Sequence, residues 1–267
     1  MKKRLDILTT EQGIFPSREK AKASIMAGLV YVDGQRCDKP GTPVSETAQI
    51  AVKEDLCPYV SRGGLKLEKA LKTWDFALDG AKAVDIGAST GGFTDCMLMN
   101  GAAKVYCIDV GYGQLDWKLR NDPRVVNMEK CNVRYLDVDE IGRNVDFISI
   151  DVSFISLKLV FPVAAELLDA SGCLVCLVKP QFEAGREQVG KKGIVRDPQV
   201  HRQVIRQVIG YGEDNGLYTW GLTYSPVTGT KGNIEYLLFM KKQKCDNDID
   251  TDSLIDSVVS DSHEELK

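Results

Sequence analysis

The sequence predicts an α/β fold in which a parallel sheet with crossover helices follows a small amino-terminal α+β module. From about residue 80 onward, short apolar runs alternate with helix-length segments, which is typical of a parallel sheet. Before residue 60 the chain instead shows one basic helix-like segment and short strands around an Asp-Gly turn. A chain of 267 residues, 43% of them hydrophobic, is long enough to bury two cores.

The first module covers residues 1–60 and begins with the basic segment. Ser17 is placed to cap a helix whose apolar residues repeat every four positions, and Gly28 is expected to end it. Short strands at 30–32 and 49–53 follow, with the Asp-Gly turn and a Pro/Gly-rich loop between them. The module is therefore predicted to be a small α+β domain.

Basic side chains on this helix are the first candidate binding residues. Arg18 and Lys22 lie four residues apart and share one helix face, where they can meet successive phosphates. A solvated basic face without a ligand would give the same pattern. The segment SREKAKASIMAGLVYVDGQ, however, resembles the S-four RNA-binding domain over roughly residues 3–60. The resemblance implies RNA contact, which we assign to Arg18, Lys20 and Lys22 and, in the following SRGG segment, to Arg62.

The remaining segments divide by composition. Residues 61–80 are predicted to be a linker with a connecting helix, and residues 81–243 the second domain. The last 24 residues, from Lys244, hold two lysines and eight acidic residues. Because so few of them are apolar, residues 244–267 are expected to form a disordered acidic tail. This tail accounts for the formal net charge of −4, so that charge does not exclude an anionic partner.

Seven short apolar runs in the second domain are the predicted strands. The last two flank SPVTGTKGN, a turn-rich loop suited to an antiparallel hairpin. The sequence contains no internal repeat. The predicted strands are Ala83–Ile86, Val105–Val110, Val125–Met128, Phe147–Val152, Leu174–Val178, Tyr218–Tyr224 and Tyr236–Met240.

The segment AVDIGASTGGFTD at 83–95 carries the sharpest chemical signal. An apolar strand runs through Asp85, a glycine-rich turn follows, and a helix begins. Glycines let the backbone approach a ligand closely, and a helix N-terminus favours polar or anionic groups, so a nucleotide-like cofactor is predicted. The spacing fits neither the dinucleotide-binding motif nor the P-loop. It resembles instead the first motif of S-adenosylmethionine-dependent methyltransferases, D-x-G-x-x-x-G.

An acidic residue at the next strand supports this cofactor. Asp109 lies 24 residues beyond Asp85, about where a carboxylate should accept the ribose hydroxyls. A tight glycine turn followed by a helix-capping Asp109 is the structural alternative. Asn132, after the third strand, is placed to bond the adenine edge. The candidate cofactor-binding residues are Asp85, Gly87, Ser89, Gly91, Gly92, Phe93, Asp109 and Asn132.

The residues after the fourth strand limit which atom can accept a methyl group. They read Asp151-Val152-Ser153-Phe154, with neither a cysteine nucleophile for base carbon nor the Pro-Pro loop typical of amine methylation. A hydroxyl acceptor needs a base, but His263 lies in the tail and His201 lies on an amphipathic helix, where a structural role is expected. Lysine can serve if a nearby cation and exclusion of water lower its pKa. Lys179 ends the fifth strand at the carboxyl edge, where Asp151 ends the fourth.

The order of motifs resembles one family over residues 3 to about 242. An S-four domain, SRGG-x-K-L, DIGASTGGFTD, DVSFISL and LVKPQFE are together similar to the TlyA family of ribosomal RNA methyltransferases, also named hemolysins. Their catalytic domain is of the FtsJ type, a Rossmann-like sheet that uses S-adenosylmethionine. The resemblance implies 2′-O-methylation of a cytidine ribose, with ribosomal RNA or ribosomal subunits as partner. Carried over by motif, its Lys-Asp-Lys-Glu tetrad is Lys66, Asp151, Lys179 and Glu235.

Two other classes of function stay open at this point. One is a non-catalytic RNA-binding or ribosome assembly factor, which a cofactor titration would distinguish from an enzyme. The other is a membrane-acting hemolysin, but the sequence has no run of about 18 uncharged apolar residues and no evident amphipathic membrane segment. Its charged start, MKKRLDILTTEQGIF, is not a secretory signal. A cytoplasmic protein with no membrane contact and no obligate protein partner is expected.

The cysteines are expected to be free thiols. Eight are scattered through apolar stretches rather than set in a dense framework. Cys173 and Cys176 form a C-x-x-C, but residues three apart on a strand face opposite sides and no second pair completes a zinc site. No metal is therefore predicted.

Overall fold

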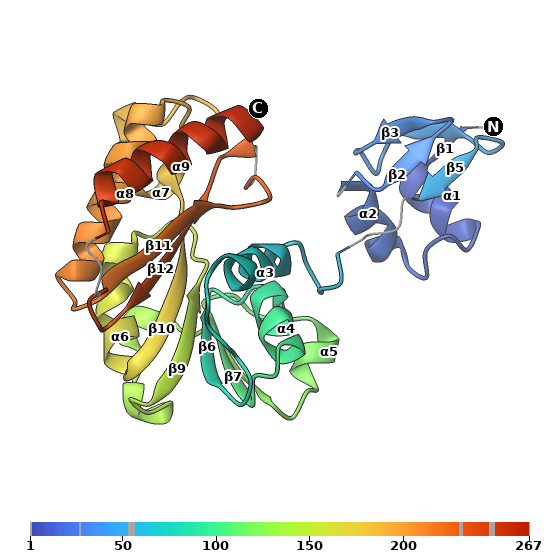
Figure 1. Ribbon diagram of the computed structural model, residues 1–267. Coiled ribbons are helices and arrows are strands. Elements are labelled where there is room, and N and C mark those ends of the chain that lie inside the picture. The colour runs from blue at the N-terminus through green and yellow to red at the C-terminus, as the bar shows by residue number, and fades with distance from the viewer. Residues whose placement is uncertain (1, 27, 53–56, 230–231, 246–248, 267) are drawn as a thin grey trace. The chain divides into compact units, whose positions relative to one another are not determined.

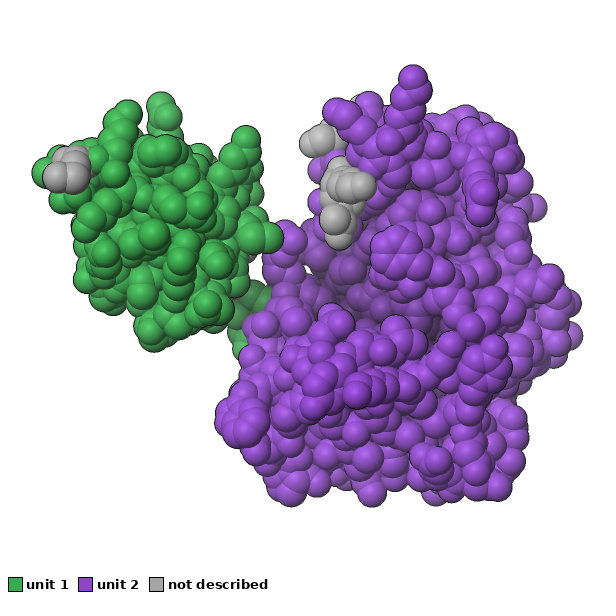
Figure 2. Space-filling model, turned by 180° about the vertical axis from the view of Figure 1, so that it is seen from behind, with its two compact units in different colours: residues 1–58 green, residues 59–267 purple. Residues whose placement is uncertain are grey.

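The computed structural model describes residues 2–26, 28–52, 57–229, 232–245 and 249–266. The chain divides into two compact units, Met1–Pro58 and Tyr59–Lys267, which are coloured separately in Figure 2. The boundary falls two residues before the one predicted from the sequence.

Unit 1 is an α+β domain, as its sequence pattern predicts. Helices α1 and α2 pack on two small antiparallel sheets, one of two strands and one of three in the order β3-β2-β5. Ser17 Oγ accepts the Lys20 N–H, and Gly28, at φ +74°, follows the end of α2 as expected. The predicted second strand is β5; its last residue, Lys53, lies outside the described residues. The elements are β1 (Lys2–Arg4), α1 (Leu5–Glu11), α2 (Arg18–Met26), β2 (Val30–Val32), β3 (Gln35–Cys37), β4 (Pro43–Ser45) and β5 (Ile50–Val52).

The sheet of unit 2 has seven strands in the order β11-β12-β10-β9-β6-β7-β8. Strands β10, β9, β6, β7 and β8 pair in parallel, and β12 runs antiparallel to both β10 and β11, so the predicted terminal hairpin is confirmed. All seven predicted strands are present with shifts of a few residues, apart from an early start of β10. They are β6 (Lys82–Ile86), β7 (Lys104–Asp109), β8 (Val125–Glu129), β9 (Val145–Ile150), β10 (Leu168–Val178), β11 (Tyr218–Tyr224) and β12 (Tyr236–Lys241).

Helices cover both faces of this sheet (Figure 1), which gives two cores. One core packs α3 and α4 on the sheet, with Leu67 and Met97 fully buried. The other packs α6, α8 and α9, with Phe161 and Ile205 fully buried. The helices are α3 (Gly63–Thr73), α4 (Gly92–Met99), α5 (Trp117–Arg120), α6 (Phe161–Leu167), α7 (Pro180–Glu183), α8 (Pro198–Glu213) and α9 (Thr251–Glu265), with 3-10 turns η1 (Val133–Tyr135), η2 (Val138–Glu140), η3 (Leu157–Leu159) and η4 (Arg186–Gln188).

The acidic carboxyl-terminal segment is a docked helix, so the prediction of a disordered tail over 244–267 is wrong for residues 251–265. Helix α9 buries Ile255, Val258 and Val259 against α8 and β11. Its outer face is held by ion pairs from Arg202 and Arg206 of α8 to aspartates of α9. The apolar residues are few, but their spacing of three and four places them on one helix face, which an average composition conceals.

The segment predicted as a linker, 61–80, is also part of unit 2. Its helix α3 packs against α4, and Leu67 and Ala70 are fully buried in the core beneath them. This segment therefore belongs to the folded core of unit 2.

Candidate active site

Asp85 anchors the glycine-rich loop from within the protein. Its side chain is almost fully buried in β6, where Oδ2 accepts the Thr94 backbone N–H and hydroxyl at 3.0 and 2.7 Å. Oδ1 accepts the Ser149 hydroxyl of β9 at 2.8 Å. Burial raises the pKa of Asp85 to about 6, although these bonds act to lower it. Asp85 thus joins the loop to α4 and β9.

Gly87 brings the loop next to the end of β9. Its φ is +86°, and a Cβ there would lie 2.4 Å from the backbone oxygen of Asp151. Gly91, at φ +94°, differs from expectation, because a Cβ there would meet Leu119 at 2.2 Å and Leu115 at 2.8 Å. The close approach that Gly91 allows is to protein side chains rather than to a ligand.

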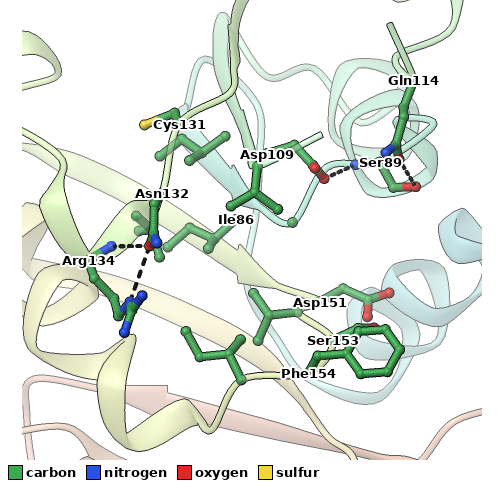
Figure 3. A pocket seen from close by; sticks show the side chains of 16 residues that line it. Ile86, Ser89, Asp109, Gln114, Cys131, Asn132, Arg134, Asp151, Ser153 and Phe154 are labelled. Carbon is green, nitrogen blue, oxygen red and sulfur yellow. Dashed lines mark hydrogen bonds between the residues drawn. The ribbon is translucent and has the colours of Figure 1, made fainter. Parts of the chain in front are cut away.

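A cavity of about 530 Å³ lies at the carboxyl edge of β6 and β7 (Figure 3). Asp109 lines it, and its carboxylate accepts the backbone N–H groups of Ser89 and Gly111 at 2.8 and 2.7 Å. Asn132 lines it from the end of β8, with Oδ1 accepting from the Arg134 backbone N–H. The apolar side chain of Ile108 forms part of the wall, so the cavity combines apolar walls with a carboxylate and an amide.

A second cavity, of about 430 Å³, shares Gly87, Ser89 and Asp151 with the first. Its other walls include Arg62, Gly92, Phe93 and Lys66. Together the two cavities run along the glycine loop from Asp109 to the amino-terminal end of α3.

The four predicted tetrad residues meet beside this second cavity. Lys66 Nζ lies 2.8 Å from Glu235 Oε2 and 3.6 Å from Asp151 Oδ2. Asp151 Oδ1 in turn lies 2.5 Å from Lys179 Nζ, which also donates to Ser153 Oγ at 3.2 Å. The structure therefore joins Glu235, Lys66, Asp151 and Lys179 in one chain of alternating charges.

Sheet topology explains this convergence. Asp151 and Lys179 follow the adjacent parallel strands β9 and β10, so both lie at the carboxyl edge. Glu235 precedes the antiparallel strand β12, whose first residue pairs with the last residue of β10, and it therefore reaches the same edge. Lys66 arrives from α3, where its side chain is only one-tenth exposed.

Mutual pairing within the tetrad keeps two side chains, Lys66 and Asp151, ionised. Burial acts to lower the pKa of Lys66, but the carboxylates of Asp151 and Glu235 outweigh it and raise that pKa above its ordinary value. Burial acts to raise the pKa of Asp151, but Lys66 and Lys179 hold it below its ordinary value.

Sequence reasoning missed three residues at this site. Phe154 has φ +63°, unusual for an aromatic residue, and its side chain is 91% exposed, with its ring 4.8 Å from that of Phe182. Gln181 donates to Glu235 Oε1 at 3.3 Å. The buried Asn233 bridges two backbone groups of the 190–196 loop. Phe154 is within the DVSFISL motif, but the sequence reveals neither its backbone angle nor its exposure.

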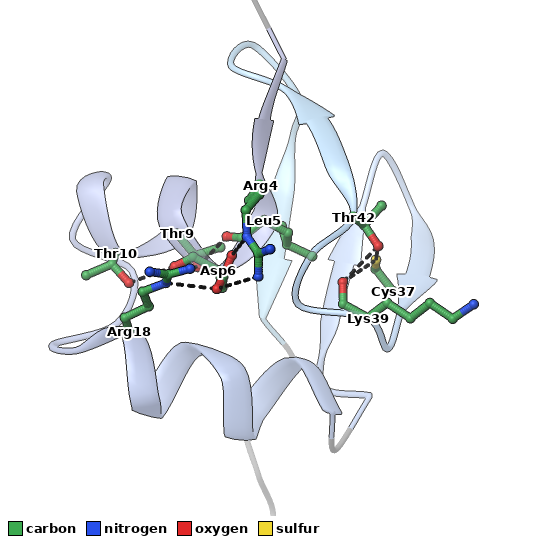
Figure 4. Close-up of polar contacts among 9 residues, drawn as sticks. All are labelled: Arg4, Leu5, Asp6, Thr9, Thr10, Arg18, Cys37, Lys39 and Thr42. Atoms are coloured by element: carbon green, nitrogen blue, oxygen red, sulfur yellow. Dashed lines mark hydrogen bonds and ion pairs between the residues drawn. The ribbon is translucent and has the colours of Figure 1, made fainter.

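In unit 1 the basic residues of α2 divide into two kinds, and Figure 4 shows the contacts of the first, Arg18. Arg18 Nε lies 2.9 Å from Oδ2 of the fully buried Asp6, and Arg4 lies 2.9 Å from its Oδ1. The hydrogen bond from Arg4, together with Arg18, lowers the pKa of Asp6 to about 2 despite burial. Lys20 is exposed and Lys22 is half-buried. Arg18 therefore helps to hold unit 1 together, whatever else it contacts.

His201 has the structural role that its helix pattern predicts. It is fully buried, with Nδ1 2.7 Å from the Tyr236 hydroxyl and Nε2 3.1 Å from the Val195 carbonyl oxygen. Burial lowers the pKa of His201 to about 4, so the ring is neutral near pH 7. The Nε2 atom of His263, from α9, lies 3.2 Å from Nδ1 of His201.

The described residues contain no group of three His, Cys, Asp or Glu side chains that could hold a metal ion. No described helix is long and apolar enough to cross a membrane.

The fold and the cavity define a class of protein. A mostly parallel sheet with one antiparallel strand next to its edge, a glycine loop after β6 and a carboxylate at the end of β7 are the arrangement of S-adenosylmethionine-dependent methyltransferases.

Comparison with known families places the chain within that class. Residues 59–242 match the FtsJ-like methyltransferase family, and residues 3–50 match the S4 domain. The chain therefore belongs to the FtsJ-like methyltransferase family and carries an S4 domain ahead of the catalytic domain, which confirms the resemblance found in the sequence.

Individual relatives agree with this assignment. The protein YqxC of Bacillus subtilis carries the provisional name of an rRNA methyltransferase. It is 52% identical to this chain, over 90% of this chain and 85% of the length of YqxC. The 16S/23S rRNA (cytidine-2′-O)-methyltransferase TlyA of Mycobacterium tuberculosis is 44% identical over 90% of both chains. A solved Streptococcus thermophilus protein, named provisionally as a hemolysin, is 47% identical with a TM-score of 0.79, over 99% of this chain and 97% of that one.

Proposed function

We propose that this protein transfers a methyl group from S-adenosylmethionine to the 2′-hydroxyl of a cytidine ribose in ribosomal RNA. The observation that carries the proposal is the chain of four charged residues at the end of the glycine-loop cavities. The target nucleotide follows from relatives such as the cytidine-2′-O-methyltransferase TlyA, with which the chain aligns over 90% of its length.

The residues of the first cavity fit S-adenosylmethionine. Asp109 presents a carboxylate that already receives two backbone N–H groups and can accept ribose hydroxyls with its remaining lone pairs. Ile108 offers an apolar wall to the adenine, and Asn132 an amide to its edge. Asp85 contributes indirectly, by holding the loop, and Gly87 keeps the loop close to Asp151.

The chemistry divides between cofactor and protein. The cofactor supplies an activated methyl group on a sulfonium, so the protein must align the attacking hydroxyl and manage one proton. We assign Lys179, in its neutral amine form, to accept the 2′-hydroxyl proton, so the Lys179 ammonium must first release its own proton to solvent. Asp151 holds the Lys179 amine at 2.5 Å, and Lys66 with Glu235 balances the charge of that pair. The exposed ring of Phe154, three residues after Asp151, offers a surface on which the target base can stack.

The S4 domain is proposed to dock the RNA. Lys20 and Lys22 project from α2 and can meet phosphates, and Arg62 borders the second cavity of unit 2. Ribosomal RNA or a ribosomal subunit is then the partner, and the cytoplasm is where the protein would meet it.

The test is methyl transfer from labelled S-adenosylmethionine to purified ribosomal subunits, followed by mapping of the modified nucleotides. We expect label on cytidine 2′-oxygens. Label on a base, or cofactor binding without any transfer, would contradict the proposal and favour a non-catalytic RNA-binding or assembly factor.

A further inference from the structure

Beside the active site, the loop that links η4 to α8 carries three basic side chains at 191–196. Lys191, Lys192 and Arg196 are all exposed. Within the part of the chain that the structure describes, none of the ion pairs includes them. Together with Gly190 and Ile194 they line a concavity of about 510 Å³.

The conformation of this loop is fixed by its own backbone. The Gly193 N–H donates to the Gly190 carbonyl oxygen at 2.7 Å, so Lys191 and Lys192 occupy the two central positions of a tight turn. The Gly190 N–H donates to Ile194 O at 3.1 Å and closes the loop. The one acidic residue that lines the concavity, Asp197, directs its carboxylate to the Gln199 N–H as the cap of α8.

Asn233 bonds this turn to the segment that directly precedes β12. Its side chain is 4% exposed, its Nδ2 donates to Gly193 O at 3.0 Å, and its Oδ1 accepts from the Val195 N–H at 3.3 Å. Asn233 lies two residues before Glu235. Gly193 and Asn233 also line a cavity of about 340 Å³ together with Lys66, Lys179 and Glu235. Asn233 therefore fixes the position of the basic turn relative to the tetrad.

We propose that Lys191, Lys192 and Arg196 form a binding site for the RNA backbone next to the target nucleotide, and that Asn233 is the positioning residue that holds this site in register with Glu235. The inference rests on the proposed function, because it identifies how unit 2 itself holds the substrate. The cations are exposed and spread along a turn, an arrangement that suits a string of phosphates, whereas a small anion is usually bound by buried, convergent donors.

Lysine contacts to phosphate have a measurable signature. Each contact contributes about 0.7 to 0.9 to the slope of log K against log salt, because it releases counterions. Lys191→Gln with Lys192→Gln should therefore reduce that slope by about 1.4 to 1.8 and weaken RNA binding about tenfold at moderate salt. Cofactor affinity, and the single-turnover rate at saturating RNA, should stay within about twofold.

A matched control removes two lysines from the opposite edge of the sheet. Lys104 begins the parallel strand β7, and Lys244 follows the antiparallel strand β12, so both lie away from the tetrad. Lys104→Gln with Lys244→Gln changes the net charge equally and should leave the salt slope near that of the parent. If the two double variants show the same slope of log K against log salt, the proposed binding site is contradicted.

Asn233→Ala tests the positioning role separately. With the cations present but no longer held, RNA KM should rise and kcat should fall about tenfold, while cofactor affinity is unchanged. Asn233→Asp should behave alike, because a carboxylate cannot donate to Gly193 O. If either variant lowers only the melting temperature, Asn233 is merely structural. Absence of methyl transfer by the parent enzyme would instead refute the proposed function, so the two failures are distinguishable.

Discussion

Replacing Lys179 separates the proposed catalytic role of the tetrad from its contribution to stability. Lys179→Ala removes the amine that lies 2.5 Å from Asp151 Oδ1 and 3.2 Å from Ser153 Oγ. Asp151 then keeps only Lys66, at 3.6 Å, and Lys66 is shared with Glu235. The substitution therefore leaves a carboxylate underpaired as well as an active site without its proposed proton acceptor.

The size of each effect can be estimated from the geometry. Breaking a buried ion pair costs about 3–5 kcal/mol, and because the Asp151 side chain is 20% exposed, the lower end, about 3 kcal/mol, applies. For a unit of this size that corresponds to a fall of roughly 6–12 °C in melting temperature. Loss of an acid or base group should lower the rate of methyl transfer by about 100-fold or more.

Lys179→Arg distinguishes the two effects. Guanidinium can pair with Asp151 and should restore most of the melting temperature, but it does not give up its proton near neutral pH and cannot take one from a hydroxyl. The assay is single-turnover transfer of labelled methyl to RNA, with melting curves and cofactor titrations of both variants. Lys179→Arg with a rate within about tenfold of the parent would refute the assignment of Lys179, whatever the stability data show.

Other perturbations address the cofactor cavity, the terminal helix, the buried histidine and the S4 domain. Asp109→Ala should weaken S-adenosylhomocysteine binding about tenfold or more in a calorimetric titration and leave RNA affinity unchanged. If the variant binds the cofactor as tightly as the parent, Asp109 does not contribute to cofactor binding. Ile255→Ala should lower the free energy of unfolding in urea by about 2–5 kcal/mol, since its side chain is fully buried; no loss would mean that α9 is not docked. Burial holds the pKa of His201 at about 4, below its ordinary 6.5, so its contribution to stability is fully present above about pH 6.5 and is lost as the pH falls towards 4. His201→Gln should therefore flatten the decline in melting temperature across that range, and an unchanged profile would point to another group. Lys20→Glu with Lys22→Glu should weaken RNA binding and reduce its salt dependence, and identical binding curves would remove α2 from the RNA path.

The strand segments, and the positions of two of the four tetrad residues, could be predicted because their signals are local. Strands β6 to β10 read as apolar runs, and Asp151 and Lys179 follow two of them directly. Parallel strands place such residues at one edge, so their proximity follows from topology. Glu235 and Lys66 needed the resemblance to a family, because 169 residues separate them.

Other features depend on contacts that a sequence does not display. The role of Asp85 as an internal anchor depends on Ser149, which the fold brings to it from 64 residues away. Gly91 was expected at the ligand, but only the packed structure reveals Leu119 in that space. Helix α9 was not predicted because the average composition of the segment is polar. Its few apolar residues nevertheless lie on one helix face, where they can pack together.

The position of β12 between β10 and β11 bears on how the chain becomes active during its own synthesis. Lys66, Asp151 and Lys179 are translated before Glu235, which directly precedes β12, and β12 lies between β10 and β11 in the completed sheet. Until Glu235 is in place, the other three residues carry an excess positive charge, and Lys66 lacks its carboxylate partner at 2.8 Å. A chain that ends before Glu235 therefore contains every residue that lines the first cavity but only three of the four tetrad residues. Under the role proposed for Glu235, methyl transfer therefore requires completion of the sheet.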